Sequence, residues 1–260
     1  MKQWNGLLKK EWATMRGQFF ATLGAWLLFT LLIPFGSSLF NRGLDALELS
    51  LILSLVWVVA SLLIPTVMFL ISLGKEMNRP DIWLHSPASI FKLFGSKAVF
   101  AGFVGFVNMM IPTIVVIIES RFSGFPVVLS FITTLNIAGL VFVVFYMLSL
   151  LVMCTGLFFG VLYQLMKPVM GGFTIPNVVI LFLFSSWLVE RISSTAVYKK
   201  ISNIGPIKGP GEGVFNIEEG NFFFEIDTTL FYMGDTLLNL LLGVLLFITA
   251  VVLFEKKVRI

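Results

Sequence analysis

Long apolar runs alternate with short polar segments along the whole chain. Six of these runs are long enough to cross a bilayer as helices, because about 20 residues span the roughly 30 Å of hydrocarbon. They cover residues 19–40, 49–73, 98–118, 126–166, 173–189 and 236–254. The pattern predicts an all-α integral membrane protein with six transmembrane helices.

The run at residues 126–166 is long enough for one tilted helix or for two tight crossings. One crossing places twelve basic and four acidic residues on one side and six basic and ten acidic residues on the other. The basic side then consists of residues 1–18, 74–97, 167–172 and 255–260. Because cytoplasmic flanks collect Lys and Arg, we expect one crossing, both termini in the cytoplasm, and a multi-pass protein of the cell membrane.

Composition agrees with this prediction and excludes several functions. The chain is 58% hydrophobic and only 12% charged, whereas soluble domains are nearer half apolar and a quarter charged. The net charge of +4 does not indicate nucleic-acid binding, because no basic and aromatic surface remains outside the spans. With one Cys and one His, the chain cannot supply the usual zinc or haem ligand sets, and we expect it to hold no cofactor.

Residues 1–18 are expected to form an amphipathic helix on the cytoplasmic membrane surface, ahead of a transmembrane domain at residues 19–260. At 100° per residue its apolar side chains fall within an arc of about 140°. These side chains are Trp4, Leu7, Leu8, Trp12 and Met15. Glu11 also falls inside the arc and has no basic residue at i±3 or i±4. It either points to water or forms a salt bridge with another segment or a partner chain.

The cytoplasmic loop at residues 74–97 has more apolar side chains than a simple connection needs. They are Trp83, Leu84, Ile90, Phe91, Leu93 and Phe94. Residues 87–94 are expected to form a short helix that Gly95 ends. This helix either lies on lipid, with Lys92 and Lys97 at the headgroups, or contacts a soluble partner. The residues alone leave both interpretations open.

The largest external segment, residues 190–235, has a Gly/Pro-rich turn region followed by three consecutive phenylalanines among acids. We expect these phenylalanines to pack on the outer membrane surface or between the ends of spans. No ionisable residue lies near the centre of a predicted span, which argues against a proton- or sodium-coupled transporter. The chain also lacks a P-loop and the HExxH and GxSxG motifs. It is therefore not expected to be an enzyme by itself.

Three features together are similar to a known family. They are the start Leu7-Leu8-Lys9-Lys10-Glu11, the six spans with both ends inside, and the loop Leu84-His85-Ser86-Pro87-Ala88-Ser89 that continues to Lys97. The whole chain resembles a permease subunit of the ABC-2-type exporter family. The enlarged segment before the last span also fits this family, in which it forms short external helices.

The resemblance implies a half-transporter that pairs with a second copy or a related permease and binds two copies of a separate ATPase, which holds ATP and Mg. The loop after the second span would be the coupling helix that receives force from the ATPase. Its implied contacts are Trp83, Leu84, His85, Ser86, Pro87, Ile90 and Phe91. The N-terminal helix, with Trp4, Leu8, Glu11 and Trp12, would lie on the membrane beside the ATPase.

The cargo implied by the resemblance is hydrophobic or amphipathic. Small bacterial permeases of this kind export amphipathic peptide toxins, peptide antibiotics or lipids, and the absence of charge within the spans suits such cargo. A different interpretation is a non-transporting membrane scaffold or sensor that binds a cytoplasmic partner through residues 74–97. An ATPase that co-purifies with the chain would favour the exporter.

Overall fold

The computed structural model of the chain describes residues 2–39, 46–77, 89–122, 131–208, 214–216, 223–225 and 229–258. The helices of this part are α1 (Lys2–Leu27), the π-helix η1 (Leu28–Leu32), α2 (Ile33–Leu39), α3 (Ala46–Ala60), the 3-10 turn η2 (Ser61–Leu63), α4 (Ile64–Met77), α6 (Ile90–Phe122), α7 (Phe131–Met170), the 3-10 turn η3 (Gly171–Phe173), α8 (Thr174–Ser193), α9 (Ala196–Ser202) and α10 (Met233–Val258). The strands are β1 (Pro206–Lys208), β2 (Val214–Asn216), β3 (Phe223–Glu225) and β4 (Thr229–Tyr232). The protein is therefore almost entirely helical, as predicted.

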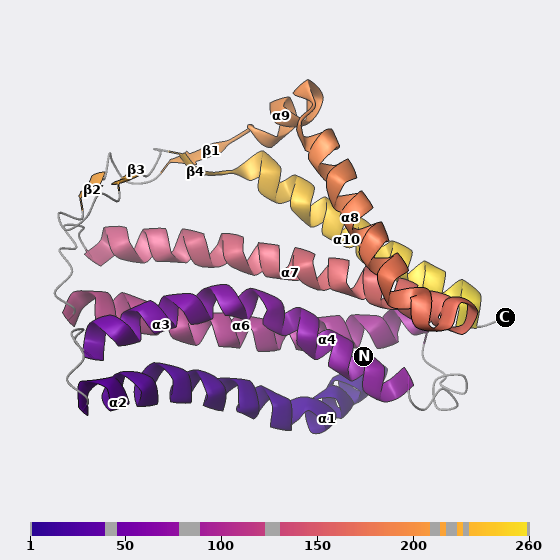
Figure 1. The fold of residues 1–260 in the computed structure, drawn as a ribbon, viewed down its shortest axis with the longest axis horizontal. Helices are drawn as coiled ribbons and strands as arrows, with labels where there is room; N and C mark the ends of the chain where they lie inside the picture. Colours follow the sequence, from indigo (N-terminus) through magenta and orange to yellow (C-terminus); the bar gives the residue numbers. More distant parts are fainter. Residues whose placement is uncertain are drawn as a thin grey trace.

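Most helices lie side by side as a bundle (Figure 1). α6 is central, because it packs against α1, α3, α4 and α7, while α10 packs mainly along α7. The buried core includes Met15, Phe69, Phe94, Val104 and Phe254, so it joins α1, α4, α6 and α10. These contacts bring the start of α1, the end of α4, the start of α6 and the end of α10 to one end of the bundle.

Five helical stretches in the described part are long and apolar enough to cross a membrane. They are Gln3–Gly36, Ala46–Met77, Ile90–Ser120, Thr134–Ser193 and Met233–Lys256. Their outward surfaces are largely apolar, as expected for helices whose backbone polar groups are satisfied internally while their side chains meet lipid. The structure thus supports a membrane protein built of apolar helices.

The stretch Thr134–Ser193 contains both α7 and α8. The two helices meet at η3, where Gly171 has a φ of 53°, a left-handed conformation that glycine adopts readily. α8 turns back from the end of α7 at an angle to the bundle (Figure 1). α7 itself is one continuous helix of 40 residues, which confirms the expectation of one long helix in this run. At 1.5 Å per residue it is about 60 Å long.

Two predicted boundaries are wrong. α1 continues through residue 18, so the N-terminal helix and the first apolar run form a single helix. α6 begins at Ile90 and does not end at Gly95. Gly95 instead allows a close approach between helices, since a Cβ there would lie 3.1 Å from the Trp4 ring. The predicted coupling helix is, in its described residues, the first turn of α6.

The described residues between α8 and α10 are only partly helical. α9 is capped by the Thr195 side chain, which accepts a hydrogen bond from the Tyr198 backbone N–H. Two antiparallel strand pairs follow, β1 with β4 and β2 with β3. The expectation of a helical external segment is therefore incomplete, because alternating residues in this segment also favour short strands.

A buried ionic cluster as the candidate functional site

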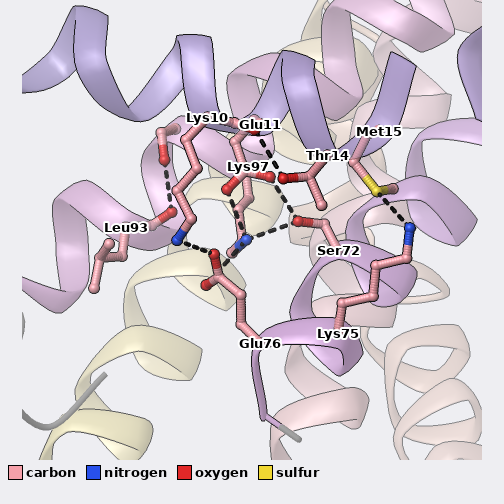
Figure 2. A network of polar contacts seen from close by, with 10 residues as sticks. Lys10, Glu11, Thr14, Met15, Ser72, Lys75, Glu76, Leu93 and Lys97 are labelled. Atoms are coloured by element: carbon pink, nitrogen blue, oxygen red, sulfur yellow. Dashed lines mark hydrogen bonds and ion pairs between the residues drawn. The ribbon is translucent and has the colours of Figure 1, made fainter. Parts of the chain in front are cut away.

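The side chain of Lys97 lies in the interior of the bundle and is only 2% exposed. Its ammonium group donates to Glu11 Oε1 at 2.8 Å and to Ser72 Oγ at 2.7 Å. It also forms an ion pair with Glu76 Oε2 at 3.2 Å (Figure 2). These three contacts match the three N–H donors of a lysine ammonium.

The other members of the cluster complete the network. Ser72 Oγ donates to Glu11 Oε2 at 2.7 Å, so its hydroxyl accepts from Lys97 and donates to Glu11. Lys10 Nζ, closer to the surface, lies 2.6 Å from Glu76 Oε1. Two cations therefore face two carboxylates, and the ionic cluster (Lys10, Glu11, Ser72, Glu76 and Lys97) is neutral overall.

Helical spacing explains why these residues meet. Ser72 and Glu76 are four residues apart on α4 and share a face. Glu11 shares a face of α1 with the buried Met15, four residues later. Lys97 follows the buried Phe94 on α6. The cluster thus ties three helices together, and its apolar surroundings strengthen each polar contact.

The structure distinguishes between the two interpretations of Glu11. Glu11 is 3% exposed and paired with Lys97, so the salt-bridge interpretation is confirmed and the water-facing one is wrong. The interpretation in which Lys97 meets lipid headgroups is also wrong, because Lys97 is buried. Both outcomes have one cause, since the start of α1 packs against α4 and α6 at this point rather than presenting Glu11 to water.

The predicted docking residues fall into two groups. Residues 83–87 (Trp83, Leu84, His85, Ser86 and Pro87) lie outside the described part of the chain. Ile90, which the resemblance places at the ATPase contact, is buried in the core. Phe91 is 56% exposed, with its ring 5.9 Å from that of Phe247. Phe94 is buried, with its ring 5.1 Å from that of Phe254.

The aromatic residues of the N-terminal helix lie beside α6. The Trp4 ring covers Gly95. Trp12 is partly exposed, and its ring is 6.2 Å from Phe100 and 5.6 Å from Phe19. Leu8 is half-buried. These tryptophans therefore hold α1 against the bundle.

In the described residues, no group of three or more His, Cys, Asp or Glu side chains could hold a metal ion. The cluster connects α1, α4 and α6 through paired charges and one hydroxyl. Sequence reasoning missed Lys97, Ser72 and Glu76 as partners of Glu11, although the unpaired Glu11 in an apolar arc was a signal that a partner existed.

A second polar group lies where α9 meets α10. Asp235 accepts from Tyr198 Oη at 3.2 Å and from Asn239 Nδ2 at 3.2 Å. Partial burial and the neighbouring Asp235 carboxylate raise the pKa of Tyr198 above its ordinary value. Asp235 and Asn239 also line a surface pocket of about 420 Å³ beside α7.

Comparison with known proteins gives no match to a family model, a curated protein or a solved structure. The function is therefore inferred from the arrangement of the helices and from the ionic cluster that holds α1, α4 and α6 together.

Proposed function

We propose that this chain is the transmembrane permease subunit of an ATP-driven exporter of the ABC-2 type, which moves hydrophobic or amphipathic cargo out of the cell. A separate ATPase, with its ATP and Mg, would supply the energy. The observation that carries this proposal is the ionic cluster, because it joins the end of α4 to the first turns of α6, the two helices that flank residues 78–88 in the sequence.

The geometry suits a loop that transmits force. Glu76 lies one residue before the end of α4, and Lys97 lies in the second turn of α6. Their ion pair of 3.2 Å joins the end of α4 to the start of α6. Lys10 and Glu11 join α1 to the same pair of helices. A push on the loop would therefore move α1, α4 and α6 as one body rather than bending one helix.

Six crossings with both termini in the cytoplasm fit this arrangement. The bend at η3 lets α8 return as a crossing separate from α7, and the start of α1 then shares one side with the end of α10. That side holds the basic segments predicted to be cytoplasmic. Phe91 and residues 83–87 would face the ATPase, a second permease copy or a paired permease would complete the pathway, and lipid would cover the remaining apolar surface.

A direct test is co-purification of the tagged chain from its native membrane, followed by reconstitution in nanodiscs. We expect a P-loop ATPase to accompany the chain, and amphipathic peptides to stimulate its ATP hydrolysis. The triple variant Trp83→Ala, His85→Ala and Phe91→Ala should lose the ATPase, whereas the exposed control Lys92→Ala should keep it.

The cluster adds a second arm to this test. The variant Lys97→Met should keep the ATPase but lose stimulation by cargo, because binding is intact and force transmission is not. If the triple variant still binds the ATPase, the docking surface is wrong. If the chain purifies with a soluble partner that lacks a P-loop, the scaffold or sensor function is favoured instead.

A further inference from the structure

Polar residues recur every eleven residues on two neighbouring helical segments. Eleven residues turn an α-helix by about 1,100°, which is only about 20° from three full turns, so each row lies on one face. The rows are Ser50, Ser61 and Ser72 on α3, η2 and α4, and Lys97, Asn108 and Glu119 on α6. Five of the six are buried in the bundle, and Glu119 is half-buried.

The two rows face each other in antiparallel register. Ser50 Oγ lies 2.5 Å from Glu119 Oε1 at one end, and Lys97 Nζ lies 2.7 Å from Ser72 Oγ at the other. Since each row advances by the same number of residues, Ser61 and Asn108 lie at matching levels between these pairs. We call this set of six residues, with Ser54 one turn from Ser50, the polar seam.

Part of the polar seam has polar atoms that the protein does not satisfy. Glu119 Oε2, Ser54 Oγ and Asn108 Oδ1 are buried and have no hydrogen-bond partner among the described residues. Ser54 is 0% and Asn108 is 1% exposed. A buried polar group without a partner costs about 1–3 kcal/mol. These three groups lie on the facing segments α3 and α6 between the levels of Glu119 and Asn108, and together they indicate a ligand that donates hydrogen bonds.

The seam near Lys97 differs, because its polar atoms are paired within the ionic cluster. Between the two parts lies an apolar layer. Pro65 packs so closely on Gly105 that a Cβ there would overlap its ring. Phe69, Ala101 and Val104 beside them are buried.

We propose that the polar seam binds water between Glu119 and Asn108, and that the apolar layer closes this hydrated half from the ionic cluster. Water is the ligand that fits, since it donates to the carboxylate and amide oxygens and exchanges hydrogen bonds with the Ser54 hydroxyl. The hydrated half is about 16 Å long, given 1.5 Å per residue over eleven residues. It enters the bundle from the end at Glu119 and stops at Pro65 and Gly105.

This inference does not depend on the exporter proposal, and cysteine accessibility tests it. The only cysteine of the chain is Cys154, so the single replacement Cys154→Ser gives a cysteine-free background. Ser54→Cys and Asn108→Cys would then be introduced one at a time, with Ala101→Cys in the apolar layer as the matched buried control. The probe is a small water-soluble methanethiosulfonate, applied to the full chain in lipid nanodiscs so that both faces are reachable.

Thiols react as thiolates, which form where water is present, and burial in apolar surroundings suppresses them. Each unit by which burial raises the pKa of a thiol lowers its thiolate fraction about tenfold. We therefore expect modification at Ser54→Cys and Asn108→Cys at least about tenfold faster than at Ala101→Cys, measured by intact-protein mass spectrometry. Equal rates at all three positions would overturn the proposal.

A second measurement covers the case in which a cysteine variant does not fold. Asn108→Leu places an apolar side chain of similar size in the hydrated half, and Asn108→Ser keeps a polar one. Hydroxyl-radical footprinting, which labels side chains beside bound water, should lose its signal at residues 112–116 of α6 in Asn108→Leu and keep it in Asn108→Ser. Absence of labelling at these residues in the unmodified chain would contradict the inference as directly as equal thiol rates.

Discussion

Replacing Lys97 by methionine tests the ionic cluster most directly. Methionine keeps much of the length and apolar volume of lysine but removes the ammonium that contacts Glu11, Ser72 and Glu76. Lys10 remains near Glu76, whereas Glu11 becomes a buried carboxylate whose one remaining contact in the cluster is the Ser72 hydroxyl. The variant therefore leaves a charge in the bundle without its counter-ion.

The expected loss follows from the contact distances and the burial. At about 3 Å and an effective dielectric constant near 20, each ion pair gains roughly 5–6 kcal/mol of attraction. Desolvation of the charges offsets most of that gain, so an intact buried pair contributes little net stability. Removing one partner, however, costs about 3–5 kcal/mol. For a chain of this length that corresponds to a fall in Tm of roughly 6–20 °C.

The assay is thermal unfolding in detergent or nanodiscs, followed by the fluorescence of the six tryptophans. The matched control is Lys92→Met, because Lys92 is exposed on the same helix, and we expect it to change stability by less than about 0.5 kcal/mol. Adding Glu11→Gln to Lys97→Met should restore more than half of the loss, since it removes the orphaned charge. Equal Tm values for the two lysine variants would refute the reasoning, and so would a double variant less stable than Lys97→Met.

Two further predictions concern close packing and the external segment. Gly105→Ala should lower the Tm by several degrees, because the new Cβ would overlap the Pro65 ring. The control Gly139→Ala places a Cβ that meets no atom within 4 Å, and it should leave the Tm unchanged or raise it, since alanine favours helices over glycine by about 1 kcal/mol. A larger loss of Tm in Gly139→Ala than in Gly105→Ala would contradict the packing. The ionisation of Tyr198 can be measured as the difference between the absorbance titrations of the unmodified chain and of Tyr198→Phe. Its pKa should be higher than that of an exposed tyrosine. The change Asp235→Asn should lower its pKa only partway, because burial, the larger cause, remains; an unchanged titration would remove the carboxylate from the explanation.

The helices of this fold could be predicted from sequence, since a chain in hydrocarbon must satisfy its backbone internally and long apolar runs therefore become helices. The continuity of α7 followed from the charge distribution of its flanks. The boundaries of α1 and α6 did not follow, because Gly95 is a common helix-ending signal. Its use as a contact for Trp4 depends on which helix lies beside it.

The ionic cluster was harder to predict for a related reason. Glu11 and Lys97 are 86 residues apart, and local sequence does not fix how two helices are rotated toward each other. Glu11 stood out as unpaired, but Lys97 resembled an ordinary basic residue at the end of a span. The spacing of eleven residues in both rows of the polar seam is visible in the sequence, and it becomes informative once the rows are known to be antiparallel neighbours.

The ionic cluster also constrains the order in which the chain enters the membrane during synthesis. The translocating machinery meets Glu11 first and Lys97 much later, and a lysine is costly to insert while it lacks a counter-ion. Lys97 therefore meets both of its carboxylate partners only when α1 and α4 are already beside α6. Every residue of the cluster is made before α7 begins, so α1, α3, α4 and α6 can form a neutral intermediate to which α7, α8 and α10 are added.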